Sequence, residues 1–235
     1  MPDVALLTFA HRGGLDGGFR PNSLEAFGDA LGRGCEIETD LRLSADGRVV
    51  CAHDAFSFAG THSVWVARMS VAALARSDVP TLDQLYQQLG TDFEVSADLK
   101  VPAAAGPAIA VAAGVGARRR LWLVSDDLQL LSTIRAGDAE VRLVHEARHR
   151  DLAAEGIEPK DHLARLAAAR IDAVNTTVAR WTPALVDHAR QLGLVVFGSL
   201  LQTRPAMDRA VTLGLDGFYS DHLDLMRAAV AEAAP

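Results

Sequence analysis

The feature that most constrains the fold is an alternation of short apolar runs with longer helical stretches along the 235 residues. The runs are rich in Val, Leu and Phe, as buried parallel strands are, and the stretches between them carry Ala and Leu at helical spacing. The runs predicted to be strands are ALLTF, CEIETDLRL, FEVSADLK, RLWLVS, VRLVHE, DAVNT, LVVFGSL and DGFYS. This order predicts a closed TIM (β/α)8 barrel, which typically takes about 250 residues.

Helical stretches separate most of these strands. We expect them at SLEAFGDALGRG, TLDQLYQQLG, LQLLSTIRAG, DHLARLAAAR, PALVDHARQLG and PAMDRAVTLG. Several end in glycine, a common helix stop, at Gly34, Gly90, Gly137, Gly193 and Gly214. The pattern falters only at 55–79, where SVAALARS predicts a weak helix, and we interpret this segment as a short insertion beside the barrel mouth. No linker divides the chain, so residues 1–235 are expected to form a single domain.

Composition excludes several classes of partner. The 30 acidic and 23 basic residues give a formal charge of −7, which argues against binding to nucleic acid or to anionic membranes. No apolar run approaches the roughly 18 residues of a membrane span, so stable membrane anchoring is not expected. Cys35 and Cys51 are too few for a disulfide framework, and the start MPDVALLTFA lacks a positively charged leader. These features predict a cytoplasmic protein with reduced thiols, and they carry no signal of oligomeric state.

Polar residues gather where the predicted strands end. In such barrels the site lies at the carboxyl ends of the strands. The candidates there are His11, Arg12, Glu38, Asp40, His53, Asp98 and Lys100. Because strand side chains alternate between faces, Glu38 and Asp40 point the same way, as do Asp98 and Lys100. Two neighbouring strands would then direct carboxylates into one barrel mouth.

Close carboxylates raise each other's pKa unless a cation offsets their charge. Oxygen ligands suit a hard divalent cation such as Mg2+ or Ca2+, with Mn2+ also possible. Taken alone, a Glu-x-Asp motif more often forms salt bridges at a rim, here with Arg42 or Arg48. The surrounding histidines and cations favour the metal interpretation instead.

The HRGG and CAHD segments supply the proton-transfer groups. His11 and His53 offer two imidazoles for general acid–base chemistry, and Arg12 is suited to a bidentate phosphate contact. Together with Lys100 and the carboxylates, these groups suit cleavage of a phosphodiester.

The order of these motifs resembles the glycerophosphodiester phosphodiesterase family. The matching segments are AHRGG at 10–14, NSLEAF at 22–27, IETDLRLSADGRVVCAHD at 37–54, VPTLDQL at 79–85, DLK at 98–100 and GLDGFYSD at 214–221. The resemblance implies a TIM barrel that hydrolyses small-molecule glycerophosphodiesters to an alcohol and glycerol 3-phosphate.

The resemblance also implies a role for each candidate residue. It makes His11 and His53 the acid–base pair, and Glu38, Asp40 and Asp98 the ligands of one divalent cation. Arg12 and Lys100 would contact the substrate phosphate. Asp54 would orient the His53 imidazole. Which histidine is the base, and whether water or a substrate hydroxyl is the nucleophile, stay open at this point.

Three departures from the family pattern are expected to alter the site. Residues 20–23 read RPNS where the family usually has Pro-Glu-Asn-Thr, so an acidic residue near the mouth is lost. Asp98 stands where the family normally has Glu, and it is one methylene shorter. Ser199 stands near the place of a frequent Trp, which should open the alcohol pocket.

Two other functions compete with this prediction. A lysophospholipase D or sphingomyelinase-D-like enzyme would need an apolar surface for an acyl chain, and FSFAG at 56–60 with Trp65 could supply it. A non-catalytic binding protein on a decayed barrel is suggested by Asp98 and the lost Glu. The retained histidines and cations argue against decay.

Overall fold

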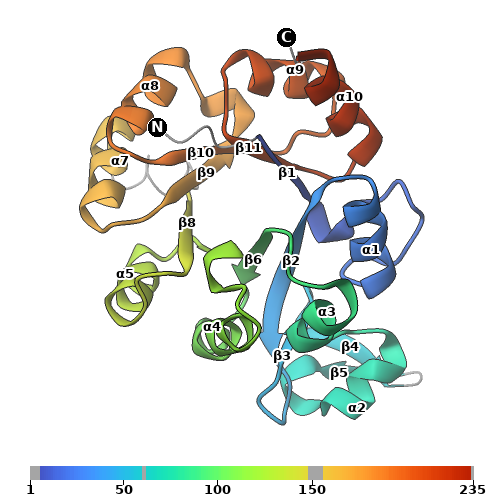
Figure 1. Ribbon diagram of the computed structural model, residues 1–235. Coiled ribbons are helices and arrows are strands. Elements are labelled where there is room, and N and C mark those ends of the chain that lie inside the picture. Colours follow the sequence, from blue (N-terminus) through green and yellow to red (C-terminus); the bar gives the residue numbers. More distant parts are fainter. Residues whose placement is uncertain (1–5, 60–61, 148–155, 234–235) are drawn as a thin grey trace.

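The computed structural model describes residues 6–59, 62–147 and 156–233. Eight parallel strands close into a barrel (Figure 1). They are β1 (Leu7–Ala10), β2 (Glu36–Leu43), β6 (Val95–Leu99), β7 (Leu121–Ser125), β8 (Arg142–Glu146), β9 (Ala173–Thr177), β10 (Val195–Ser199) and β11 (Gly217–Ser220). The barrel closes because β1 pairs with both β2 and β11. Six strands lie within their predicted runs, and β1 and β9 each extend one residue beyond theirs, so the predicted TIM (β/α)8 barrel is confirmed. Ala5 of the first run lies outside the described residues.

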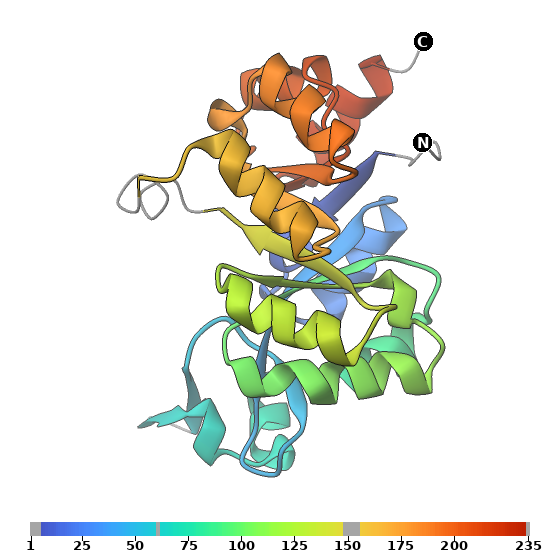
Figure 2. The ribbon, with the colours of Figure 1, turned by 90° about the vertical axis from the view of Figure 1, so that its left-hand side faces the viewer.

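Helices pack around the outside of this barrel (Figure 1, Figure 2). They are α1 (Leu24–Gly32), α3 (Leu82–Leu89), α4 (Ala105–Gly114), α5 (Leu128–Gly137), α7 (Pro159–Ala168), α8 (Pro183–Gln191), α9 (Arg204–Thr212) and α10 (Leu223–Ala233). The six predicted helical stretches are confirmed. Helices α4 and α10 are not among them. Helix α4 was not predicted because Gly106 and Pro107 are loop signals in a sequence. Both lie in the first turn of α4, where a proline removes no intrahelical hydrogen bond.

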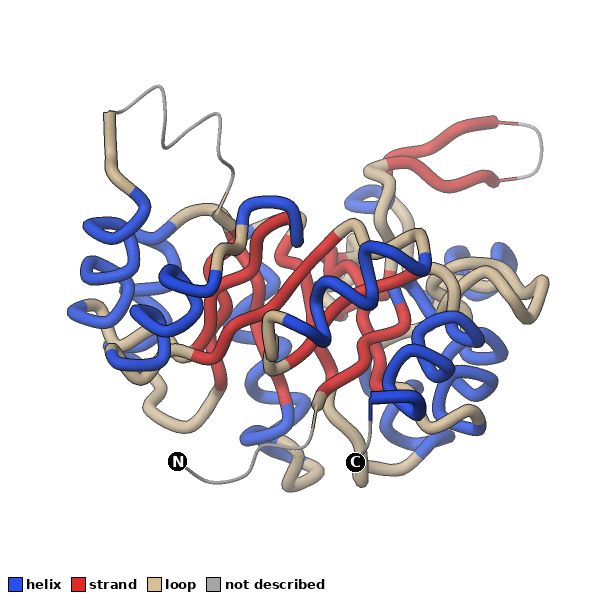
Figure 3. The backbone as a smooth tube through the Cα atoms, turned by 90° about the horizontal axis from the view of Figure 1, so that it is seen from above, coloured by secondary structure: helices blue, strands red, loops and turns tan. Residues whose placement is uncertain are grey.

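The predicted insertion at 55–79 follows a short strand, β3 (Val49–Cys51), which pairs antiparallel with β2. It contains a hairpin of β4 (Phe56–Ala59) and β5 (His62–Trp65), followed by a one-turn helix, α2 (Val71–Leu74). This helix is the weak one predicted from SVAALARS. Figure 3 shows the hairpin standing out from the barrel. Gly60 of the FSFAG segment lies outside the described residues.

Large side chains fill the barrel interior below the mouth. Phe9 stacks on Tyr219 with ring centroids 4.9 Å apart and meets Phe197 edge-on at 5.6 Å. The Tyr219 hydroxyl lies 3.0 Å from the Ser96 hydroxyl, which closes the top of this layer. Because the interior is packed, a ligand can enter only above it, at the carboxyl ends of the strands.

The sequence also predicts reduced cysteines and no membrane-spanning segment. Cys35 and Cys51 are both buried free thiols. In the described ranges no helix is long and apolar enough to cross a membrane.

A buried histidine pair joins β8 to α7 on the outer face of the barrel. The rings of His145 and His162 lie 4.9 Å apart in an edge-on arrangement. The Nε2 of His145 lies 3.1 Å from the carbonyl oxygen of Asp126, so this nitrogen carries the proton. Burial, together with the neighbouring His162, lowers the pKa of His145 to about 4.

This lowered pKa predicts acid sensitivity of the fold. Between its ordinary pKa of 6.5 and about 4, the unfolded chain binds a proton at His145 that the folded chain does not, so the free energy of unfolding falls as pH falls. The loss should reach up to about 3 kcal/mol, since one pKa unit corresponds to about 1.4 kcal/mol. Urea unfolding of His145→Gln across this range should show a shallower pH dependence than wild type. The control His188→Gln should keep the wild-type slope, and equal slopes in all three proteins would contradict the assignment.

Candidate active site

The HRGG segment forms a tight turn that places His11 and Arg12 above the mouth. It is a 3-10 turn directly after β1, in which Arg12 has a φ of 54° and Gly13 a φ of 87°. A Cβ on Gly13 would lie 2.6 Å from the Cβ of Ala26, so α1 can pack this closely only against glycine. The backbone N–H of Arg12 donates a 2.8 Å hydrogen bond to Glu38 Oε2. The turn is therefore fixed both to α1 and to β2.

A cavity of about 350 Å³ lies at the carboxyl ends of the strands, and we call it the barrel cavity. Six of the seven predicted site residues line it: His11, Arg12, Glu38, Asp40, Asp98 and Lys100. Strands β2 and β6 bring the carboxylates together, because Asp40 pairs in register with Asp98. The sequence prediction that two adjacent strands direct their acids into one mouth is confirmed.

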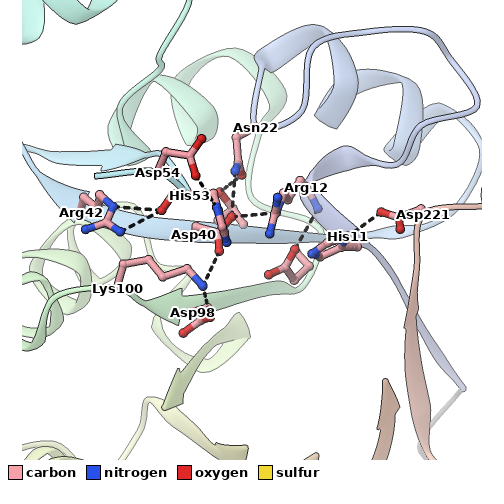
Figure 4. Close-up of polar contacts among 12 residues, drawn as sticks. His11, Arg12, Asn22, Asp40, Arg42, His53, Asp54, Asp98, Lys100 and Asp221 are labelled. Atoms are coloured by element: carbon pink, nitrogen blue, oxygen red, sulfur yellow. Dashed lines mark hydrogen bonds and ion pairs between the residues drawn. The ribbon is translucent and has the colours of Figure 1, made fainter. Parts of the chain in front are cut away.

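Asp40 lies at the centre of the polar network in Figure 4. Its side chain is 2% exposed, and it accepts hydrogen bonds from Asn22 Nδ2 at 2.9 Å and Lys100 Nζ at 3.0 Å. Arg12 Nε lies 3.2 Å away in an ion pair. Asn22 is oriented in turn by the Thr39 hydroxyl, which donates to its Oδ1 at 2.7 Å. Two cations and an amide thus compensate the buried carboxylate.

The alternative pairing of Asp40 at a rim with Arg42 or Arg48 is not seen. Arg42 donates from Nε and Nη2 to the carbonyl oxygen of His53, at 3.1 and 2.8 Å. Arg48 pairs with Asp83 on the far side of β3. Neither guanidinium competes for the carboxylates in the mouth.

Glu38 has little positive charge near it to stabilise its ionised form. Burial, and then repulsion from Asp40, raises the pKa of Glu38 to about 8. Lys100 Nζ instead lies 2.6 Å from Asp98 Oδ2 and 3.0 Å from Asp40 Oδ1. Burial acts to lower the pKa of Lys100, but the two carboxylates outweigh it and the pKa is raised. Lys100 is therefore charged, and Glu38 is the carboxylate that a further cation would ionise.

This donor set fits a divalent cation in part. The buried, like-charged pair of Glu38 and Asp40 offers the oxygen atoms that a hard cation prefers. Asp98 lines the same cavity, but its carboxylate holds Lys100. Within the described residues, no three His, Cys, Asp or Glu side chains gather closely enough to enclose a metal ion. Glu38 is the ligand offered most directly, and Asp40 and Asp98 could join it only by sharing or releasing Lys100.

His11 is held by a residue that the sequence prediction did not single out. Its Nδ1 lies 2.7 Å from Asp221 Oδ1, and Gln202 Nε2 donates to Asp221 Oδ2 at 2.6 Å. Burial lowers the pKa of His11, but Asp221 and then Glu38 outweigh it, so the pKa is raised above 6.5. Asp221 ends the GLDGFYSD segment, yet 210 residues separate it from His11. With Nδ1 bonded to Asp221, Nε2 is the nitrogen left for proton transfer.

His53 lines a different, adjoining cavity of about 240 Å³, which we call the rim cavity. Its Nδ1 lies 2.8 Å from Asp54 Oδ1, the contact expected of an orienting carboxylate. Arg12 lines both cavities, and in Figure 4 it lies between His11 and His53. The structure therefore places the two imidazoles on either side of one guanidinium.

The far wall of the barrel cavity comes from residues at or just after strand ends, and of these only Ser199 was singled out from the sequence. Its residues are Glu146, Asn175, Thr177, Ser199, Leu200 and Gln202. Ser199 lines the cavity where a Trp was the family expectation. Leu200 follows it with a φ of 61°, a strained conformation of the kind that collects at binding sites.

These features agree with the comparison with known protein families. The model of the glycerophosphoryl diester phosphodiesterase family matches residues 11–225. The chain belongs to this family. The protein is thus a phosphodiesterase, and its family membership supports hydrolysis of glycerophosphodiesters. None of the curated protein sequences compared with the phosphodiesterase matches it.

Solved structures share the fold of this phosphodiesterase at low identity. A putative glycerophosphoryl diester phosphodiesterase from Silicibacter pomeroyi has a TM-score of 0.84 and 18% identity, over 98% of this chain and 94% of that one. The glycerophosphodiester phosphodiesterase of Thermotoga maritima has a TM-score of 0.80 and 21% identity, over 95% and 97%. An Oleispira antarctica phosphodiesterase, solved with its product sn-glycerol-3-phosphate, has a TM-score of 0.77 and 18% identity, over 97% of each chain.

The Asp221 contact predicts a shift in pH dependence. In Asp221→Asn, the loss of the carboxylate should lower the pKa of His11, so the limb of the kcat/KM profile that reports His11 should move to lower pH. The change should also lower kcat by up to roughly 10²-fold, since general acid–base catalysis contributes about 10² to 10⁴-fold. Asp224→Asn, on the exposed side of α10, is the matched control. An unshifted profile in Asp221→Asn would show that Asp221 does not act through His11.

Proposed function

We propose that this phosphodiesterase hydrolyses glycerophosphodiesters to glycerol 3-phosphate and an alcohol, with His11 and His53 as its acid–base pair and one divalent cation as cofactor. The observation that carries the proposal is the position of Arg12 between the two imidazoles. A phosphate bound to the Arg12 guanidinium would have His11 on the side of one ester group and His53 on the side of the other. The product seen in the Oleispira antarctica neighbour supports glycerol 3-phosphate as the common product.

Binding and charge stabilisation come from the residues around Asp40. Arg12 and Lys100 are held by Asp40 at 3.2 and 3.0 Å, so both are fixed before the substrate binds. Groups fixed in this way stabilise charge that builds on the phosphate oxygens without reorganising. A divalent cation, Mg2+ or Ca2+, bound by Glu38 and Asp40 with Asp98 as the third arm, would supply Lewis-acid stabilisation of the same charge.

Each histidine is prepared for proton transfer by a carboxylate. Asp221 accepts a 2.7 Å hydrogen bond from His11 Nδ1, and Asp54 accepts a 2.8 Å hydrogen bond from His53 Nδ1. In each ring Nε2 is therefore the nitrogen left for proton transfer. One imidazole removes the proton of the nucleophile and the other protonates the leaving alkoxide.

Replacing either histidine should abolish most of the activity. His11→Asn and His53→Asn should each lower kcat by about 10² to 10⁴-fold, the usual contribution of general acid–base catalysis, with the fold unchanged. The measurement is glycerol 3-phosphate release from a panel of glycerophosphodiesters. His188→Asn, on α8 away from the mouth, is the control. Wild-type rates in both site variants would reject the pair.

Removal of divalent cations should also stop turnover. A chelator should abolish glycerol 3-phosphate release, and Mg2+, Ca2+ or Mn2+ should restore it in wild type. Glu38→Gln and Asp40→Asn should need a much higher concentration of the restoring ion, because each loses a carboxylate ligand. Turnover that persists in excess chelator would remove the cation from the mechanism.

A second candidate is favoured by the exposed aromatic side chains of the hairpin. Phe56, Phe58 and Trp65 are 47%, 66% and 48% exposed, and the rings of Phe56 and Trp65 lie with centroids 4.1 Å apart. Such a surface supports a lysophospholipase D or sphingomyelinase-D-like activity toward lipids. Release of choline from lysophosphatidylcholine, without release from glycerophosphocholine, would distinguish this activity from the first.

We also propose that residues 1–235 act as one domain in the cytoplasm. The closure of the barrel between β1 and β11 supports the first point, and the buried free thiols of Cys35 and Cys51 support the second.

A further inference from the structure

The two cavities that meet at Arg12 differ in charge. The described lining of the barrel cavity carries four acidic side chains, those of Glu38, Asp40, Asp98 and Glu146, against the cations Arg12 and Lys100 and the imidazole of His11. Three of the four remain carboxylates near neutral pH, because the pKa of Glu38 is raised to about 8. Among the described residues, the rim cavity is lined by two guanidiniums, those of Arg12 and Arg20, by the imidazole of His53, and by one carboxylate, that of Asp54. Asp54 is itself engaged with His53 Nδ1. The rim cavity is therefore the positive side of the site.

Arg20 is held at this cavity by the insertion. Its Nη1 donates to the carbonyl oxygen of Ser77, whose hydroxyl donates to the carbonyl oxygen of Phe58 at 2.6 Å. A guanidinium has five N–H donors in a planar fork, so one bond to Ser77 leaves donors for an anion. Arg20 is exposed, so an anion can approach it from the solvent.

The walls of the two cavities suit different arms of a phosphodiester. Hydroxyl and amide side chains line the barrel cavity, among them Ser96, Asn175 and Thr177. Within the part of the chain that the structure describes, the buried Oδ1 of Asn175 has no hydrogen-bond partner, so it is left as an acceptor for a ligand hydroxyl. These groups suit the glycerol arm with its two hydroxyls. The other arm then lies on the His53 side of Arg12, in the rim cavity. Ser199, which was expected from the sequence to open the alcohol pocket, borders the glycerol arm instead.

We propose that the rim cavity binds the alcohol arm and that Arg20 selects an arm with an anionic group of its own, such as a carboxylate or a second phosphate. This inference rests on the proposed function and adds the substrate class. The anionic group pairs with the Arg20 guanidinium while the scissile phosphate contacts Arg12. Arg20 is a specificity-determining residue, and it takes no part in the bond cleavage.

The test uses two substrates that differ by one carboxylate. Glycerophosphoserine and glycerophosphoethanolamine both release glycerol 3-phosphate, so one assay gives kcat/KM for each. Wild type should prefer the serine ester by about threefold to fivefold, the effect of one solvent-accessible ion pair of up to about 1 kcal/mol. The preference should shrink as salt is added, because exposed pairs are screened.

Three variants separate charge from structure. Arg20→Gln removes the charge but keeps a polar N–H donor on the side chain, and it should bring the ratio of the two kcat/KM values close to one. Arg20→Lys keeps the charge and should keep most of the preference. Arg76→Gln removes an exposed cation of the same insertion that does not line the cavity, and it should leave the ratio at the wild-type value.

The outcomes distinguish a failure of the role proposed for Arg20 from a failure of the proposed function. Turnover of both substrates with a wild-type ratio near one, or with a ratio that Arg20→Gln leaves unchanged, overturns the role of Arg20 alone. A ratio that falls equally in Arg76→Gln also overturns it, because the effect would then be general charge. Absence of turnover on both substrates overturns the proposed function, and this inference with it.

Discussion

The buried carboxylate of Asp40 is the constraint on which the rest of the site depends. A carboxylate that is 2% exposed is stable only if its charge and its lone pairs are compensated. Asn22, Arg12 and Lys100 provide this compensation from three different parts of the chain. The loop before α1, the HRGG turn and the end of β6 are thereby joined over the mouth. Removing Asp40 would leave two cations facing each other across that space.

Arg12 and Lys100 pair with Asp40, so few positive charges remain to stabilise an ionised Glu38. Two residues earlier on the same strand, it faces the same cavity, and its pKa is raised to about 8 by burial and by Asp40. The site can relieve this by binding a proton or a cation. The same arrangement explains why the cavities differ: the carboxylates collect on the barrel side of Arg12, while Arg20 and His53 lie on the rim side. An anionic substrate thus meets a more acidic lining on the barrel side of its phosphate than on the rim side.

Local sequence was enough for most of the fold because strand and helix periods are local properties. The eight apolar runs coincide with the barrel strands, and α4 was missed only because Gly106 and Pro107 resemble loop signals. The site was predictable where its residues follow strands directly, as Glu38 and Asp40 do. Asp221 was not found because its partner His11 lies 210 residues away in the chain, and Gln202 was not found because it acts only through Asp221.

The sequence by itself determined the number of strands, the strand ends at which the acids, imidazoles and cations lie, and the faces to which they point. These follow from the alternation of side chains along a strand and the parallel order of the strands. Only the tertiary structure decided the partners. Asp40 binds Arg12 and Lys100 rather than Arg42 or Arg48, His11 is held by Asp221, and His53 opens on a second cavity. Barrel closure brings β11 beside β1 and so brings Asp221 to His11. The sequence pattern of either segment alone does not predict which side chains of the other segment it will contact.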